Sequence, residues 1–162
     1  MPSDILTRKA LSLVRCLDRI RQKTPPTAAA LKGNLDLQDI LSVNLQRAVQ
    51  LCVDIAAHVL AEQGTDVPVR MRDAFRNLAD KSLISKRTAD VMYKAVGFRN
   101  RAVHEYDEID WDIVYEIVTD GLGDLRGFLQ ELAKGGFLIA SPPAAPRAGR
   151  KRTVSRKRKR GK

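Results

Sequence analysis

The feature that most constrains this 162-residue chain is a long apolar periodicity in its first half. Apolar side chains there recur at spacings of three and four, which places them on one face of an α-helix. They are Leu41, Leu45, Ala48, Val49, Cys52, Ile55, Ala56 and Val59. The pattern predicts a helix over about residues 36–63, stopped by Gly64. The rest of the chain must supply elements that cover its apolar face.

Further segments share this helical period. They are residues 5–23, 69–81, 86–104 and 110–134. No segment shows the sustained apolar–polar alternation of a strand. The sequence therefore predicts an all-α fold, an up-and-down bundle of four to five helices.

The ends and faces of these helices can also be predicted. Ser85 and Asp110 are residue types that cap helix N-termini, and both stand at the start of a periodic segment. The segment 69–81 is expected to turn Met71 inward, together with Phe75 and Leu78. The segment 86–104 is expected to turn Ala89, Met92, Tyr93, Val96 and Val103 inward.

The charge of the chain is concentrated at one end. Residues 141–162 contain ten Lys and Arg residues and no Asp or Glu, which leaves 19 basic and 19 acidic residues in 1–140. We therefore expect a helical domain over 1–137 and a disordered basic tail over 138–162. The tail is either a loose nucleic-acid contact or a solvated extension, and the neutral body needs a local site to bind a phosphate.

Several function classes lack support in the sequence. Cys16 and Cys52 lie in apolar helical segments and are expected to be reduced thiols in a cytoplasmic protein. No metal-site spacing is present, and His58 is expected to pair with Asp54 or Glu62 on its own helix. No membrane span, no cofactor and no bound metal are predicted.

The stretch FRNRAVHEY at 98–106 carries the most chemistry. Arginine guanidinium groups, here Arg99 and Arg101, bind phosphate oxygens in a bidentate fashion. His104 has an ordinary pKa of about 6.5 and can take a proton from a ribose 2′-hydroxyl. Asn100 and Tyr106 add an amide and a phenol. This set suits cleavage of a phosphodiester without a metal, but an Arg and a His at a helix C-terminus can also simply complement the helix dipole.

Helical geometry adds a constraint on this site. Arg99 and His104 are five residues apart, so an ideal helix separates them by about 140°. Either the helix distorts before His104, or the site takes the two groups from two chains related by a two-fold axis.

The pattern Arg-x4-His-x-Tyr at Arg99, His104 and Tyr106 resembles the signature of HEPN domains of the HepT family. The similarity extends over about residues 36–132, through NLQRAVQLCVDIAAHVLAEQG at 44–64 and MRDAFRNLADKSLISKRTADVMYKAVGFRNRAVHEYDEIDWDIVYEIV at 71–118. The resemblance implies a homodimeric HEPN bundle that cleaves RNA as a metal-independent endoribonuclease toxin. It implies that His104 is the acid–base residue, that Arg99 binds and stabilises the phosphate, and that Asn100 and Arg101 are secondary contacts.

The same resemblance implies a partner and an off-switch. HepT toxins are encoded beside a minimal nucleotidyltransferase antitoxin (MntA-like), which transfers AMP to the motif tyrosine, here Tyr106. The alternative for Tyr106 is a packing residue at a helix end. Two other functions stay open at this point: a non-catalytic HEPN scaffold that binds a nucleotidyltransferase, and an RNA-binding protein that acts through its tail.

Overall fold

The computed structural model describes residues 3–139, and every regular element in that range is helical. The principal helices are α1 (Asp4–Lys23), α3 (Leu35–Glu62), α5 (Lys86–His104) and α7 (Leu122–Lys134). Shorter elements are α2 (Ala28–Lys32), α4 (Asp73–Asp80), η1 (Tyr106–Glu108), α6 (Trp111–Glu116) and η2 (Ile117–Gly121). The prediction of an all-α bundle is confirmed.

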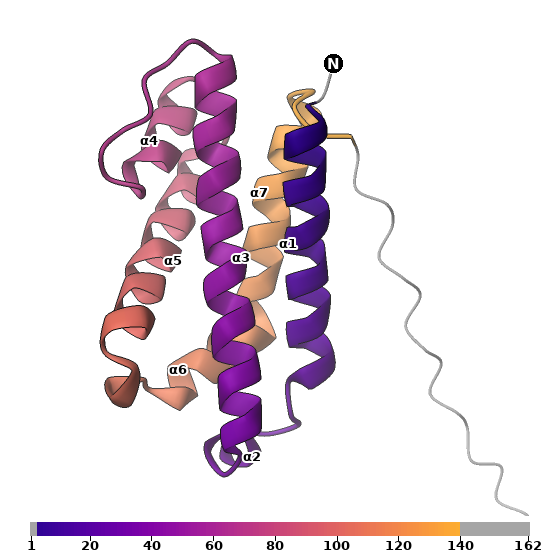
Figure 1. Cartoon of the computed structure of the whole chain (residues 1–162), viewed down its shortest axis with the longest axis vertical. Coiled ribbons are helices and arrows are strands. Elements are labelled where there is room, and N and C mark those ends of the chain that lie inside the picture. The colour runs from indigo at the N-terminus through magenta and orange to yellow at the C-terminus, as the bar shows by residue number, and fades with distance from the viewer. Residues whose placement is uncertain (1–2, 140–162) are drawn as a thin grey trace, which may run out of the picture.

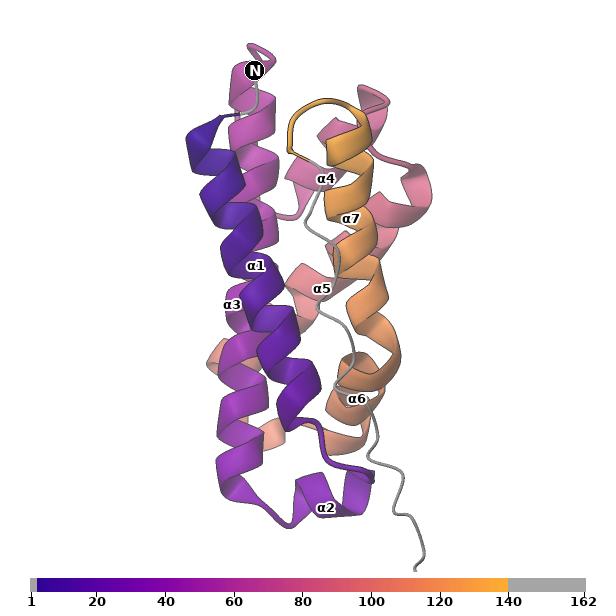
Figure 2. The same ribbon diagram turned by 90° about the vertical axis from the view of Figure 1, so that its right-hand side faces the viewer.

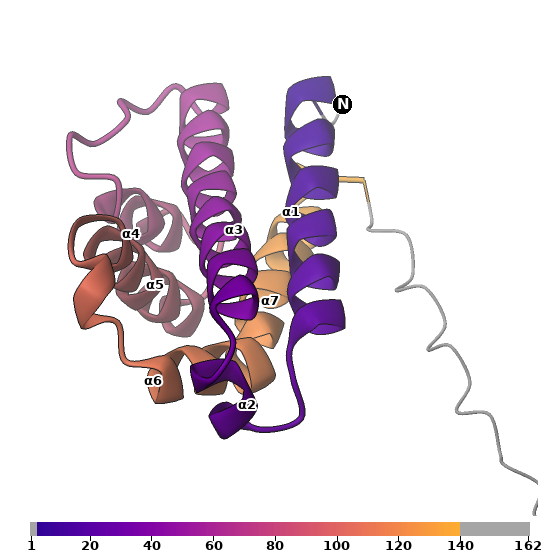
Figure 3. The same ribbon diagram turned by 60° about the horizontal axis from the view of Figure 1, so that its bottom comes forward.

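The four long helices alternate in direction along the bundle axis (Figure 1). Helix α2 connects α1 to α3 at one end, and α6 connects α5 to α7 at that same end (Figures 1 and 2). With the lower end of the bundle turned toward the viewer, α3 lies between α1 and α5 (Figure 3), and its contact with α1 is the most extensive in the fold. The long apolar helix is thus the element against which the others pack.

Helix starts follow the capping residues. The Ser85 hydroxyl accepts a hydrogen bond from the Thr88 amide at 3.1 Å, and Asp110 accepts one from the Asp112 amide at 2.9 Å, as predicted. Asn34 caps α3 through the Leu37 amide at 3.0 Å, so this helix starts one residue earlier than expected. Each side-chain oxygen satisfies an amide that has no partner inside its helix.

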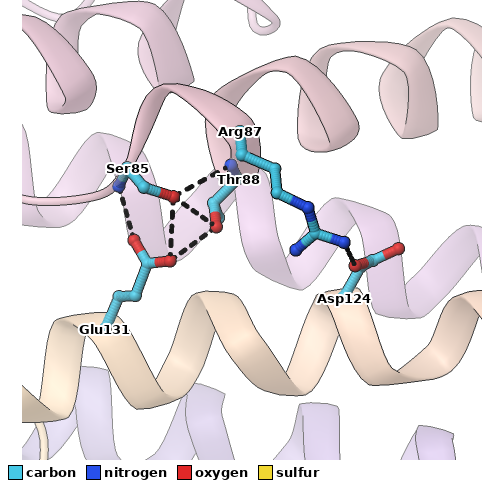
Figure 4. A network of polar contacts seen from close by, with 5 residues as sticks. All are labelled: Ser85, Arg87, Thr88, Asp124 and Glu131. Carbon is cyan, nitrogen blue, oxygen red and sulfur yellow. Dashed lines mark hydrogen bonds and ion pairs between the residues drawn. The ribbon is translucent and has the colours of Figure 1, made fainter.

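A half-buried carboxylate contact fixes the start of α5 against α7. Glu131 accepts hydrogen bonds from the Ser85 amide at 2.5 Å, the Ser85 hydroxyl at 3.1 Å and the Thr88 hydroxyl at 2.6 Å (Figure 4). Arg87 and Asp124 form a longer ion pair, at 3.5 Å, beside it. The helix that carries the FRNRAVHEY motif is therefore held at its N-terminal end by side chains of α7.

The core is mainly aliphatic, with one aromatic pair at its centre. Phe75 and Phe128 are fully buried, and their rings meet edge to face with centroids 5.5 Å apart. Cys16 and Cys52 are buried free thiols, and burial raises the pKa of each, so both stay protonated. Leu138 is also buried, one residue beyond the expected end of the domain, whereas the expected tail lies otherwise almost wholly outside the described residues.

Three details of the predicted helices are wrong. The segment 69–81 becomes helical only at Asp73, so Met71 lies in a preceding turn and is 49% exposed. Val103 is 44% exposed and so does not turn into the core. The short helix α2 was not predicted, since five residues are too few to show a period; Gln38 holds it by donating to the carbonyls of Leu31 and Lys32.

The predicted helix over 110–134 is interrupted. Its middle part, η2, is a π-helical turn between α6 and α7. The Thr119 hydroxyl donates to the Tyr115 carbonyl at 2.7 Å and to the Glu116 carbonyl at 3.2 Å. A side chain that competes for carbonyl oxygens one turn back loosens the regular helical pattern, which accounts for the wider turn.

Helix α3 is also long and apolar enough to be a candidate membrane span by length and composition. Half of its most apolar window is buried inside the bundle, as in the core helix of a soluble protein.

Candidate active site

The motif helix stays regular through its last residue. Helix α5 runs unbroken to His104, and the Glu105 amide donates to the Arg101 carbonyl at 2.7 Å. No distortion brings His104 round to Arg99. The two side chains therefore leave α5 on different faces, as ideal geometry predicts, about 140° apart.

Arg99 lies on the face of α5 that meets α3. Its Nη1 donates to the Asn100 side-chain oxygen at 3.0 Å, and its Nε is buried without a hydrogen-bond partner within residues 3–139. The guanidinium borders a shallow cavity of about 310 Å³, which is lined by Val43, Gln46, Arg47, Gln50, Leu51, Asp54 and Arg99. A buried N–H without an acceptor is costly, so Arg99 is well placed to bind an anionic ligand there.

The surface around Arg99 is partly apolar. Val43 on α3 lines the Arg99 cavity and is 51% exposed. Val103 follows Arg99 by four residues, so it lies on nearly the same side of α5, about 40° away. Two exposed valines, one on each helix, therefore lie on the Arg99 side of the molecule.

Arg101 does not join Arg99. It is two residues further along α5, a rotation of about 200°, and it borders a different cavity of about 300 Å³ between α3, α5 and α7. Most of the side chains that line this second cavity are apolar, among them Val91, Phe98 and Ile117. The structure therefore brings Asn100 to Arg99 but separates the two arginines.

His104 and His58 occupy different surroundings. His104 is exposed at the C-terminal end of α5. His58 Nε2 lies 3.4 Å from both Glu62 Oε1 and the Ser3 hydroxyl, whereas Asp54 pairs with Lys9 at 3.0 Å. Of the two partners predicted for His58, Glu62 is confirmed and Asp54 is not.

Tyr106 is held by residues that the sequence did not single out. Its hydroxyl donates to Asp39 Oδ1 at 2.5 Å, across 67 residues of sequence, and its ring packs edge to face on Trp111 with centroids 6.2 Å apart. The side chain is nevertheless 41% exposed. Burial of the hydroxyl, the hydrogen bond to Asp39 and the nearby charges of Asp39 and Asp107 raise the pKa of Tyr106 to about 12.

Asp39 also lies on a mostly polar side of α3. Asp39, Val43, Gln46 and Gln50 are spaced by three and four, which aligns them along one side of the helix. Because α3 and α5 run in opposite directions (Figure 1), this side meets Tyr106 at one end and Arg99 further along. A helical-wheel plot of 36–63 could have revealed the polar stripe, but not its partners.

Residues 13–132 match the family model of HepT-like ribonucleases. The chain belongs to the HepT-like ribonuclease family.

Individual HepT-like proteins agree with this assignment. The chain is 38% identical to the mRNA nuclease HepT of Shewanella oneidensis over 127 residues, which is 78% of this chain and 95% of that protein. It is 26% identical to the tRNA nuclease HepT of Aphanizomenon flos-aquae over 129 residues, which is 79% of this chain and 88% of that protein.

A solved complex gives the same result for the fold. The tri-AMPylated Shewanella oneidensis HEPN toxin, in complex with an MNT antitoxin, superposes with a TM-score of 0.76 at 36% identity, over 82% of this chain and 98% of that one. The predicted family, all-α HEPN fold and ribonuclease function are confirmed.

Proposed function

We propose that this chain is the toxin of a HEPN/MNT pair and acts in the cytoplasm as a metal-independent RNA endonuclease. The observation that carries the proposal is Arg99, whose half-buried guanidinium has an unpartnered Nε and borders a cavity next to the motif. An arginine in this setting offers a ready-made phosphate contact. The match to nucleases of the same fold supports RNA as the substrate.

The reaction follows from the two principal side chains. His104 accepts the proton of a ribose 2′-hydroxyl, whose oxygen attacks the adjacent phosphorus while the bond to the 5′-oxygen breaks. Arg99 stabilises the charge that develops on the phosphoryl oxygens. The leaving 5′-oxygen takes up a proton, and the products are a 2′,3′-cyclic phosphate and a 5′-hydroxyl. Asn100 holds the Arg99 guanidinium, and Arg101 is a secondary contact to the RNA backbone.

The separation of Arg99 from His104 supports a homodimeric site. Since α5 is regular through His104, one chain does not point both groups at the same phosphate. In a two-fold dimer formed through the face that carries Arg99, the second chain would cover Val43 and Val103. It would also bring His104 of the partner subunit to Arg99. In this arrangement each composite site takes one residue from each chain.

The partner is a cognate MntA-like nucleotidyltransferase, and Tyr106 is the residue it modifies. Transfer of AMP to Tyr106 places a bulky anion two residues from His104, where it blocks RNA by size and by charge. The solved complex of an AMPylated relative with its antitoxin supports this mechanism, as does the exposure of the Tyr106 side chain.

An assay with unmodified protein tests the nuclease proposal. Protein shown by intact mass to carry no AMP is incubated with RNA in excess EDTA. We expect cyclic-phosphate ends, a rate lower by about 10²–10⁴ in His104→Ala and by about 10²–10³ in Arg99→Ala. Arg8→Ala, at an exposed position on α1, is the matched control and should cleave normally. If wild-type protein free of AMP does not cut, the scaffold alternative is correct.

For the basic tail we propose a separate role: it binds RNA loosely and so raises the local substrate concentration. A chain ending at Ala140 should bind RNA more weakly and with a shallower salt dependence. An unchanged salt slope would show that the tail is a solvated extension.

A further inference from the structure

The contact between Tyr106 and Asp39 is the shortest hydrogen bond made by any motif side chain. The donor is the hydroxyl that the proposed antitoxin modifies, and the acceptor is a carboxylate 67 residues away in the sequence, on α3. Asp39 is exposed and takes part in no described salt bridge. Its carboxylate is therefore directed at the hydroxyl rather than at a cation.

A tyrosine hydroxyl is a poor nucleophile while it keeps its proton. The pKa of Tyr106 is raised to about 12 by burial of the hydroxyl together with Asp39 and Asp107, so free phenolate is scarcer here than at an ordinary tyrosine. Attack on a phosphorus atom then requires a base that removes the proton as the new bond forms. Such a base must lie within hydrogen-bond reach of the hydroxyl, and Asp39 at 2.5 Å meets this requirement.

We propose that Asp39 is the base for the modification of Tyr106, so that the toxin supplies a catalytic group for its own inactivation. This inference rests on the proposed transfer of AMP to Tyr106. The tyrosine oxygen forms a bond to the α-phosphorus of ATP, and the bond from that phosphorus to the pyrophosphate oxygen breaks. The hydroxyl proton passes to Asp39 Oδ1 and from there to solvent, and pyrophosphate leaves.

The same carboxylate also changes where the modified side chain lies. After transfer, the tyrosine oxygen no longer donates a hydrogen bond, and the attached phosphate is anionic. Asp39 and Asp107 then repel it, which removes the contact that held the ring and pushes the adenylate away from α3.

The test measures the rate at which the purified cognate nucleotidyltransferase transfers AMP from ATP to the full-length toxin. The reaction is run under single-turnover conditions, and the gain in intact mass reports the transfer. Asp39→Asn keeps an oxygen that accepts the hydrogen bond but removes the base. We expect its transfer rate at pH 7 to fall by about 10²-fold or more. Asp107→Asn removes a nearby charge without removing the hydrogen bond, and its rate should stay within a few-fold of wild type.

The pH profile separates a base from a residue that only positions the ring. The charged groups that bear on the hydroxyl are Asp39 from α3 and Asp107 from η1. Wild-type transfer should be nearly independent of pH between 7 and 9, whereas the Asp39→Asn rate should rise about tenfold per pH unit as hydroxide generates phenolate. A lower rate with no such recovery, or a rate equal to wild type, overturns the role of Asp39. No AMP on wild-type protein overturns the proposed modification itself.

Discussion

Glu131 anchors the motif helix, and its removal is the sharpest test of how the bundle holds α5. Its carboxylate accepts three hydrogen bonds, two from Ser85 and one from Thr88 (Figure 4). A hydrogen bond to a charged group contributes about 1.5–3 kcal/mol when well shielded. Because Glu131 is only half-buried, solvent lowers each bond to about 0.5–1 kcal/mol. Glu131→Ala should therefore reduce the free energy of unfolding by about 2 kcal/mol.

Urea unfolding at pH 7, followed by helical circular dichroism, measures this loss. The matched control is Gln130→Ala, an exposed position on the same helix, which should change the free energy of unfolding by less than about 0.5 kcal/mol. If Glu131→Ala is no more destabilising than this control, the contact does not hold α5 to α7.

The Glu131 contact also predicts how the free energy of unfolding depends on pH. Partial burial acts to raise the pKa of Glu131, but the hydrogen bonds from Thr88 and Ser85 outweigh it, so the folded pKa is lowered. A carboxyl with a lowered folded pKa stabilises the protein fully above its unfolded pKa and loses that contribution as the pH falls through the folded value. The stability difference between wild type and Glu131→Gln should thus be largest at neutral pH and shrink in acid; a difference that grows in acid would contradict this sign.

Two further predictions concern the surface that carries the site. Tyr106 should ionise near pH 12, as measured by the ultraviolet difference between wild type and Tyr106→Phe. Asp39→Asn should lower the pKa of Tyr106. If Tyr106 of the wild type ionises at the pH of an ordinary tyrosine, its contact with Asp39 is absent in solution. Val43→Asp should shift the protein from dimer to monomer in light-scattering chromatography, because it buries a charge in the proposed interface. Val67→Asp, at an equally exposed valine in a loop, should leave the dimer intact, and equal behaviour of the two variants would place the interface elsewhere.

Most of the helical framework could be predicted from local sequence. The three-and-four spacing of apolar residues located every long helix, and Ser85 and Asp110 marked two starts correctly. The apolar period did not predict α2 or the π-helical turn. The five residues of α2 are too few to show a period, and the π-helical turn depends on the Thr119 hydroxyl rather than on any apolar pattern.

The candidate site was predictable only in part. Helical geometry alone indicated that Arg99 and His104 diverge, and the same calculation over two residues would have separated Arg99 from Arg101. The role of Asp39 could not be predicted from the sequence, because its contact with Tyr106 joins residues 67 positions apart. A period shows which side of a helix is buried, and it does not show which side chain of another helix its polar face will meet.

In the proposed homodimer, each cleavage site takes Arg99 from one chain and His104 from the other. The most direct measurement is RNA cleavage in EDTA by an equal mixture of Arg99→Ala and His104→Ala proteins, unfolded and refolded together. Random pairing makes half of the dimers mixed, and each mixed dimer keeps one intact site of two, so activity should recover to roughly a quarter of wild type. If the mixture stays as inactive as either variant alone while refolded wild type cleaves, Arg99 and His104 do not act across the two chains.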